Sequence, residues 1–358
     1  MRRSSALYVV SWITLCLCFS VFHLPDVELV QAQSARVQRV FSSVDPGGIG
    51  GYPSTIVWSA DSRNIVFDGD SYGYTLVERS QGEGFWQSYD VTTQQLARTT
   101  RWPLQPMLTS SERLAMGERE NFAFVSPNGE FAVFAGARLA DYTSPLLLSN
   151  RTTGTIQTLG TILLFPLTSD AVLWSQDSIS ALIAVQTPVE YLAFQLVNFA
   201  NPVNPLVLWF NITNDGAGQG HIVHTLLDLS DDGTRALIRI PVIGTMSPQF
   251  RLASINMSDP TQTEWISSEA GNQVFAAAFR DDDESTILVA SELGIVQLDI
   301  ATNTTQILIT DPILAERGLA PRVQRVGMFS PDTNWFAFHT EREVYVVDLT
   351  TVLPPPSN

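Results

Sequence analysis

Cysteine is nearly absent from this chain of 358 residues, and its scarcity excludes two ways of stabilising a fold. The only two cysteines, Cys16 and Cys18, lie in an apolar stretch near the start of the chain. If that stretch is removed, the remaining chain can form neither a disulfide nor a thiolate metal site. A domain of this length needs neither, because its hydrophobic core can be large.

Lysine is absent, and charged residues of both signs are few. All 20 basic residues are arginine and 36 residues are acidic, so the formal net charge is −16. We therefore expect no nucleic-acid partner, because affinity for phosphate comes from clustered Lys and Arg. An anionic membrane surface is disfavoured for the same reason. With 16% charged and 45% hydrophobic residues, the chain also lacks the composition of a disordered protein.

The start of the chain has the pattern of a secretory signal. Two arginines precede the apolar segment 6–22, and a polar segment ending in small residues follows. We expect residues 1–32 to be a signal peptide, cleaved after Ala32 or alternatively after Ala35, and the mature protein to be secreted or periplasmic. The alternative is an uncleaved anchor, because the apolar segment is close to the shortest that spans a bilayer. No later segment is long enough and apolar enough to do so.

A motif made of an apolar strand, a short turn with Asp or Asn and a second apolar strand occurs six times. Its copies span residues 56–67, 122–134, 171–185, 225–240, 275–290 and 325–340. The turn residues are Asp61, Asn128, Asp177, Asp232, Asp282 and Asp332. Such side chains accept hydrogen bonds from backbone amides two residues later and tolerate left-handed backbone geometry. Each copy is therefore expected to be a hairpin.

A second half follows each copy, in which a strand ends at Asp or Asn and a polar turn leads, except in the last copy, into another strand. These halves span residues 85–100, 144–160, 194–209, 250–266, 294–309 and 343–351. The strand-ending residues are Asp90, Asn150, Asn198, Asn256, Asp299 and Asp348. Each unit is thus four short antiparallel strands in about 50 residues. Stacking six such sheets radially buries both faces of each, which predicts an all-β, six-bladed β-propeller. A β-sandwich is the alternative, and the regular period disfavours it.

At these residues the sequence resembles a known family. The pattern (W/F)-S-x-D-x-x-x-(I/L)-x-(F/V), followed by a strand ending in Asp and a Thr-rich turn, is similar to the PD40 (WD40-like) repeat of TolB-like propellers. The SPDG turn of that repeat is intact in no copy: the six read SADS, SPNG, SQDS, SDDG, RDDD and SPDT. The resemblance implies the fold. It does not imply one activity, because such repeats occur in periplasmic scaffolds and in propeller domains of peptidases.

No group of residues in the sequence indicates catalysis, so we expect no enzyme, no cofactor and no metal. The G-x-S-x-G motif of a hydrolase domain is missing. His221 and His224 have an i, i+3 spacing that suits a helix rather than the strand expected there. The segment 68–73 begins like a calcium loop, but Glu78 comes one residue too early to complete it.

A secreted hydrolase of the glycosidase type, with its site at the channel mouth, is the alternative function. The segment 230–234, SDDGT, resembles the Asp-box of sialidase propellers, although that box is a structural turn. We interpret the acidic turn residues as solvated turns rather than as paired catalytic carboxylates. These residues are Asp231, Asp232, Asp281, Asp282 and Asp283. The third histidine of the mature chain, His339, has no predicted role.

Four N-x-S/T sequons begin at Asn150, Asn211, Asn256 and Asn303. In a secreted eukaryotic protein they would be acceptors for glycans on surface turns. Three of them fall in or beside the expected second turns, so turn chemistry explains them equally well.

Propellers bind ligands on the loops that join the second strand to the third and the fourth strand to the next blade. The longest such loops are residues 68–84 and 101–120, and long loops in a compact domain are usually functional or disordered. Their aromatic and arginine side chains are of the kinds enriched at interfaces. The predicted binding residues are Tyr72, Tyr74, Trp102, Arg113 and Arg119. Alternatively, the segment SSERLAMGERE forms a short covering helix. We expect a monomer that binds a protein or an extracellular ligand.

The sixth unit lacks a fourth strand, because three prolines, Pro354 to Pro356, follow its third. The segment 36–42 lies before the first repeat and has a strand pattern. Its residues Val37, Arg39 and Phe41 alternate with Gln38, Val40 and Ser42. We predict that it pairs antiparallel with 343–349 and closes the ring, so that the propeller spans 33–353 and 354–358 is a tail.

Overall fold

A computed structural model shows how these repeats fold. It describes residues 37–42, 56–59, 61–68, 86–99, 108–117, 123–141, 143–163, 172–185, 193–198, 206–210, 225–242, 249–257, 263–266, 274–280, 283–310, 327–340 and 343–353. The expected signal peptide, residues 1–32, and the tail, 354–358, lie outside these ranges, so both boundaries stay predictions.

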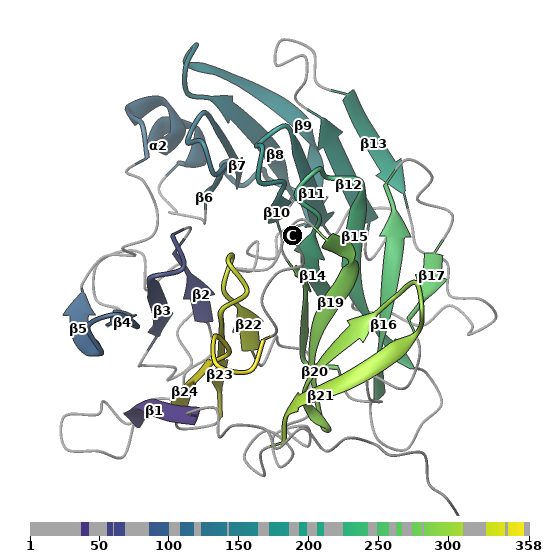
Figure 1. Ribbon diagram of the computed structural model, residues 1–358. Helices are drawn as coiled ribbons and strands as arrows, with labels where there is room; N and C mark the ends of the chain where they lie inside the picture. The colour runs from purple at the N-terminus through teal and green to yellow at the C-terminus, as the bar shows by residue number, and fades with distance from the viewer. Residues whose placement is uncertain are drawn as a thin grey trace, which may run out of the picture. The chain divides into compact units, whose positions relative to one another are not determined.

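Six antiparallel sheets of four strands contain the repeats, one sheet to a unit, as predicted (Figure 1). The first blade consists of β2 (Ile56–Trp58), β3 (Asn64–Asp68), β4 (Trp86–Asp90) and β5 (Gln95–Thr99), and the second of β6 (Ala123–Val125), β7 (Phe131–Ala135), β8 (Thr143–Asn150) and β9 (Thr155–Leu163). The third consists of β10 (Val172–Trp174), β11 (Ser180–Val185), β12 (Ala193–Asn198) and β13 (Leu206–Phe210), and the fourth of β14 (Thr225–Leu229), β15 (Arg235–Val242), β16 (Gln249–Asn256) and β17 (Thr263–Trp265). The fifth consists of β18 (Ala276–Arg280), β19 (Asp283–Ser291), β20 (Gly294–Asp299) and β21 (Thr304–Ile309). The sixth sheet combines β22 (Gly327–Phe329), β23 (Trp335–His339) and β24 (Glu343–Asp348) with β1 (Val37–Ser42). The chain is a six-bladed β-propeller.

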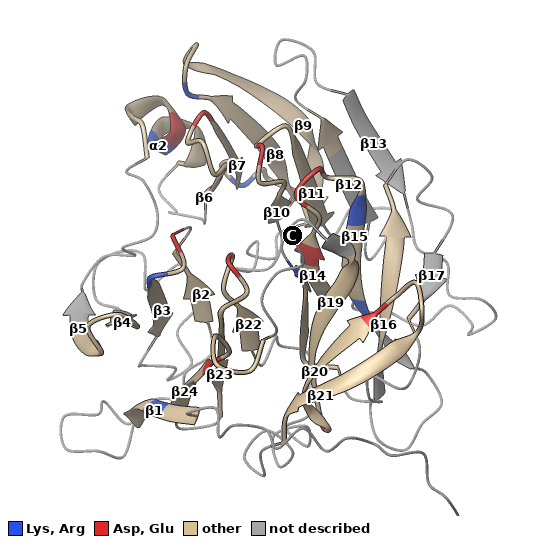
Figure 2. Ribbon diagram, viewed as in Figure 1, with Lys and Arg blue, Asp and Glu red and all other residues tan. Residues whose placement is uncertain are grey.

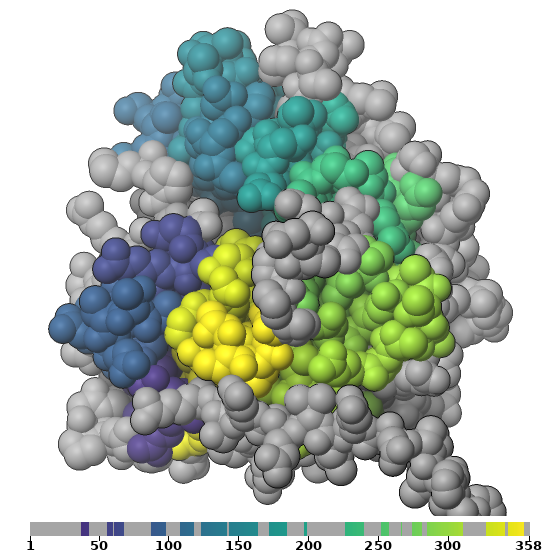
Figure 3. Space-filling view, viewed as in Figure 1, coloured from purple at the N-terminus to yellow at the C-terminus, as the bar shows by residue number. Residues whose placement is uncertain are grey.

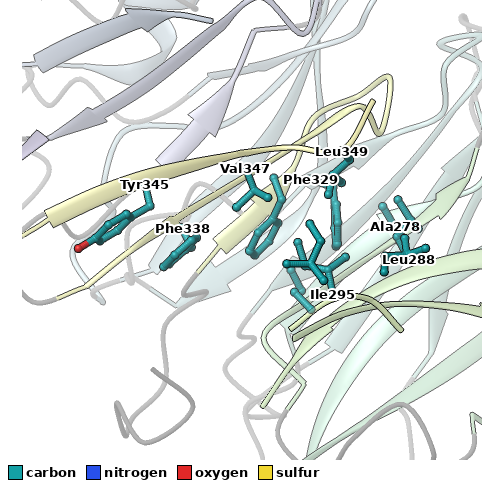
Figure 4. Close-up of a cluster of buried hydrophobic side chains, with 13 residues drawn as sticks. Ala278, Leu288, Ile295, Phe329, Phe338, Tyr345, Val347 and Leu349 are labelled. Atoms are coloured by element: carbon teal, nitrogen blue, oxygen red, sulfur yellow. The ribbon is translucent and has the colours of Figure 1, made fainter. Parts of the chain in front are cut away.

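Apolar layers between neighbouring blades form the core, because alternate residues of a strand point to opposite faces of its sheet. In the fifth blade, Ala277 and Phe279 pack with the fourth blade, whereas Ala276 and Ala278 pack with the sixth. Figure 4 shows the latter layer, where Ala278 lies close to residues of the sixth blade. Burial on both faces explains why these strands are continuously apolar in sequence.

A serine and an Asp or Asn two residues later build the first turn of the blade. In the sixth blade, the Ser330 hydroxyl donates to Asp332 Oδ1 at 2.6 Å and accepts from the Trp335 amide at 3.0 Å. Asp332 Oδ1 also accepts from the Asn334 amide, two residues on, as predicted. The same bonds recur at Ser59, Ser126, Ser175 and Ser230.

The left-handed residue of this turn is the one after the acidic residue, not the acidic residue itself. Backbone φ is positive at Ser62, Gly129, Ser178, Gly233 and Thr333. The tolerance of Asp and Asn for left-handed geometry is therefore not used in these turns. The side chain of the Asp or Asn is already fixed by the amide two residues on, and the reversal of the chain falls on the next residue. Thr333 is the strained case, because β-branched residues rarely adopt positive φ.

The second turns follow the predicted Asx chemistry. Asp90 Oδ1 accepts from the amides of Thr92 and Thr93, and Asn150 Oδ1 accepts from the amide of Thr153. The Asn150 side chain is also buried, so this sequon serves the turn.

β1 closes the ring in the sixth blade, as predicted. It pairs antiparallel with β24, from Val37 opposite Val347 to Ser42 opposite Glu343. β1 also reaches the first blade: the ring centroids of Phe41 and Phe67 lie 5.3 Å apart. Figure 3 shows the yellow atoms of the sixth blade directly against those of the first.

A bulge at Val40 breaks the predicted alternation of β1. The register shifts between Arg39 and Phe41, so that Val40 has no partner on β24. Val37 therefore packs in the layer between the fifth and sixth blades, whereas Val40 and Phe41 both pack against the first blade. Placing Phe41 on the face of Val37 was wrong, because a bulge turns every later side chain over.

Candidate functional site

A short helix, α2 (Ser110–Met116), lies in the loop between the first and second blades. Thr109 caps it: its hydroxyl accepts from the Glu112 amide at 3.2 Å, and the Glu112 carboxylate accepts from the Thr109 amide at 2.8 Å. This reciprocal pair satisfies two donors that the first turn leaves open. The helix ends at Gly117, with φ at +77°. Of the segment SSERLAMGERE, for which the sequence left a covering helix open, residues 110–116 are helical and residues 118–120 lie outside the described residues.

A buried ion pair fixes α2 to the second blade. Arg151 follows β8, and its Nε and Nη2 donate to the two oxygens of Glu112 at 2.8 and 2.9 Å. The Glu112 side chain is fully buried. Burial alone raises the pKa of this carboxyl, but hydrogen bonds from Arg151, the Thr109 amide and Ser149 outweigh it, so the pKa lies below its usual range.

Apolar contacts complete the docking of α2. Met116 is almost fully buried beside Phe134 and Leu147, and Leu108 packs at the edge of the same cluster. These residues lie on the face of the second blade that points away from the third, because Val133 and Leu148 form the layer with the third blade. The helix therefore packs on the face of the second blade that carries Phe134 and Leu147.

The outer side of α2 presents apolar and basic side chains to solvent. Leu114 is 84% exposed, and Arg113 is exposed beside it, with its guanidinium donating to the carbonyl of Leu108. A loop of the second blade continues this surface, because the Ala137 amide donates to the Ala115 carbonyl at 3.0 Å.

In that loop Leu139 is 51% exposed and Arg138 is exposed. Both segments read Arg-Leu-Ala. We call residues 113–115 and 137–140 together the α2 surface; Figure 1 shows the helix beside β6 to β8.

Of the predicted binding residues, the structure places Arg113 on the α2 surface. Tyr72, Tyr74, Trp102 and Arg119 lie outside the described residues. Sequence reasoning missed Leu114 and the loop 137–140. No sequence signal marked Leu114, because it faces solvent only since Glu112 and Met116 lie on the buried side, and Glu112 is buried there by its pair with Arg151.

The residues weighed for catalysis have structural surroundings where they are described. His339 lies on β23, and its Nδ1 is 3.2 Å from the Thr340 carbonyl. Acidic residues lie at hairpin tips (Figure 2), and among the described ones Asp177 and Asp232 take part in the turn bonds, whereas Asp281 and Asp282 lie outside the described residues. At Asp61, the hydrogen bond from Ser59 lowers the carboxyl pKa, which suits a turn and not a general acid.

Metal ligands were sought across the described ranges, where no group of three His, Cys, Asp or Glu side chains could hold an ion. His221, His224 and most of the calcium-like segment 68–73 lie outside those ranges. Within the part of the chain that the structure describes, no helix has the length and apolar character needed to cross a membrane.

The comparisons with known proteins give a likeness in fold alone. No protein-family model matches the sequence, and no curated protein matches it. Among solved structures, the chain is similar to TolB from Acinetobacter baumannii, with 13% identity and a TM-score of 0.41 over 85% of this chain and 65% of that one. A putative TolB from Agrobacterium tumefaciens has 13% identity and a TM-score of 0.42, over 83% and 90%.

The β-propeller domain of the Trilobed protease from Pyrococcus furiosus is also similar, with 11% identity and a TM-score of 0.39 over 85% of this chain and 99% of that domain. The chain spans less than two thirds of the Acinetobacter TolB. The propeller architecture of this chain is established by its own six sheets.

Proposed function

We propose that this protein is a secreted or periplasmic propeller that binds a protein partner through the α2 surface and catalyses no reaction. The observation that carries the proposal is Leu114, which is 84% exposed on a helix held by a buried ion pair. Because the helix that carries this aliphatic side chain is already fixed, a partner that covers it need not order the backbone, so the side chain suits a binding anchor.

The shape of this surface favours a protein over a small molecule. Small-molecule sites are concave and bury most of their ligand, whereas the outer side of a helix is convex. Arg113 adds a guanidinium, a group enriched at protein interfaces. The secreted or periplasmic location rests on the signal pattern of residues 1–32.

Site-specific photocross-linking tests the proposal. A photoreactive amino acid replaces Leu114, and in a matched control it replaces Ile307, which is 52% exposed on β21 of the fifth blade. In the source cells, the account predicts a discrete protein adduct at position 114 and none at 307. Equal adducts at both positions, or none at 114, would refute it.

A variant separates binding from folding. Leu114→Ser removes only an exposed side chain, so the melting temperature should stay within a degree or two. Affinity for the cross-linked partner should fall at least tenfold, while Ile307→Ser should leave it unchanged. If the affinity of Leu114→Ser is unchanged, the partner does not bind through Leu114.

A further inference from the structure

The first turn of the second blade has asparagine where the other four serine turns have aspartate. Asn128 makes the same turn bonds as an aspartate: its Oδ1 accepts from the Ser126 hydroxyl at 2.7 Å and from the Glu130 amide at 3.0 Å. One side-chain oxygen is therefore enough to build the turn, and the difference lies in the second side-chain atom. The aspartates of the other turns are Asp61, Asp177, Asp232 and Asp332.

A glutamate two residues later explains the asparagine. Asn128 Nδ2 donates to Glu130 Oε2 at 3.2 Å. An aspartate at this position would place a carboxylate oxygen where Nδ2 now lies, and two like charges so close repel each other. The corresponding residues of the other serine turns are not acidic: they are Arg63, Ile179, Thr234 and Asn334.

Gly129 makes this asparagine chemically labile. Asn128 and Gly129 form the only Asn-Gly pair in the chain. Asparagine is thermolabile, because the backbone nitrogen of the next residue can attack its side-chain amide carbon, and glycine has no side chain to hinder the attack. The new N–Cγ bond closes a succinimide ring, the Cγ–Nδ2 bond breaks, and ammonia leaves with the proton of the backbone amide. Water then opens the ring at either carbonyl, which gives aspartate or isoaspartate.

The closed turn opposes this reaction at both reacting groups. The Gly129 amide donates to the Ser126 carbonyl at 2.8 Å, so the proton that the nitrogen must lose is held in a hydrogen bond. The buried Ser126 hydroxyl fixes the Asn128 side chain, which is itself exposed to water. We propose that Asn128 is a modification site, and that its conversion to aspartate or isoaspartate is controlled by the opening of this turn.

Either product would weaken the turn that forms it. Both place a new carboxylate beside Glu130, and isoaspartate also lengthens the backbone by one methylene. The turn is connected to its surroundings, because the Asn128 amide donates to the Ser178 hydroxyl of the third blade at 3.0 Å and the Glu130 carbonyl accepts from the Arg151 amide at 2.7 Å. The modification would therefore loosen the contact between the second and third blades. It does not depend on what binds the α2 surface.

Conversion rates test the proposal, because trypsin cleavage after Arg119 and Arg138 releases one peptide that contains both Asn121 and Asn128. Mass spectrometry of this peptide follows each asparagine during incubation of the protein in mildly alkaline buffer. In urea, Asn128 should convert at least tenfold faster than Asn121, which is followed by phenylalanine. In the folded protein, Asn128 should convert at least tenfold more slowly than in urea. Equal rates for the two asparagines in urea, or equal rates for Asn128 with and without urea, would overturn the proposal.

Two serine variants separate opening of this turn from general loss of stability. Ser126→Ala should raise the conversion rate of Asn128 in the folded protein at least threefold. Ser330→Ala removes the same hydroxyl from the turn of the sixth blade and should leave the rate within twofold of the wild type. Equal acceleration in both variants would show that this turn does not control the reaction.

A product mimic tests the consequence of the modification. Asn128→Asp should melt below the wild type, whereas in a Glu130→Gln background the same change should leave the melting temperature unchanged, because the second carboxylate is gone. Equal melting temperatures of Asn128→Asp and the wild type would overturn the role assigned to Glu130.

Discussion

Single serine hydroxyls hold the first turns together. Ser330 is buried, and its hydroxyl bridges the Asp332 carboxylate and the Trp335 amide within the turn. Removing such a hydroxyl leaves a buried amide unsatisfied, which costs about 1–3 kcal/mol. The repeated serine of the motif is thus a structural residue in five of the six blades.

Ser330→Ala should lower the free energy of unfolding by about 1–3 kcal/mol for this reason. Chemical denaturation monitored by tryptophan fluorescence measures the change. Ser111→Ala, at an exposed position of α2, is the matched control and should stay within about 0.5 kcal/mol of the wild type. Equal stability of the two variants would show that the hydroxyl bridge contributes nothing.

For single residues, the sequence predicts the side-chain hydrogen bonds of the turns but not which residue has positive φ. The hydrogen bond that the Asn334 amide donates to Asp332 Oδ1, two residues earlier, follows from local geometry, so the sequence predicts it. Which residue takes positive φ depends on the whole reversal of the chain. Serine, glycine and threonine all occur there, and no single residue type marks the position.

The helix α2 is an element whose stability rests on a contact distant in sequence. Glu112 and Arg151 are 39 residues apart, and the carboxylate is fully buried. Arg151→Ala should lower the free energy of unfolding by about 3–5 kcal/mol, because it leaves a buried charge without its partner. Arg113→Ala, on the exposed side of the same helix, should change it by less than about 0.5 kcal/mol. Urea denaturation of both variants would settle the comparison.

The same pair makes stability depend on pH. Since the pKa of Glu112 is lowered in the folded state, its contribution is complete above the unfolded pKa of about 4.3 and is lost as the pH falls through the folded pKa. The stabilities of the wild type and Glu112→Gln should therefore differ most at neutral pH and converge in acid. A difference that is constant down to the lowest pH would contradict this.

The closing strand β1 has a second feature that the sequence alone does not predict, the bulge at Val40. Its pairing with β24 could be predicted, because the sixth unit lacks a fourth strand and the segment 36–42 has a strand pattern. The bulge at Val40 could not, because it depends on how β1 packs against the neighbouring blades. Likewise, the predicted loop residue Arg113 lies on the α2 surface, yet its partner loop 137–140 is brought there only by the fold.

Deletion of Val40 should be tolerated better than truncation of its neighbour. Without Val40, Phe41 still lies opposite Val344 and still faces the first blade, as a regular strand requires. Phe41→Ala instead removes a buried ring and should cost about 3–5 kcal/mol. Thermal unfolding would rank the two variants, and a deletion that destabilises more than Phe41→Ala would show that the bulge itself is needed.

For the whole molecule, the central claim is that β1 completes the sixth blade and so closes the ring. An open ring would expose the apolar layer between the sixth and first blades and leave the edge of β24 unpaired. Each ladder bond of β1 contributes about 0.5–1.5 kcal/mol, and burial of Phe41 adds about 1.5–3 kcal/mol. Together these terms are comparable with the whole stability of a domain, about 5–15 kcal/mol.

The melting temperature of the chain without residues 33–43 tests this claim most directly, compared with two other chains. In one, residues 35–43 are moved to follow Val352, where a fourth strand would continue from β24 by an ordinary second turn. In the other, residues 354–358 are removed. The account predicts that the deletion melts far below the intact protein or aggregates, that the moved strand recovers part of the loss, and that removing 354–358 changes little. A deletion of 33–43 that melts like the intact protein would contradict it.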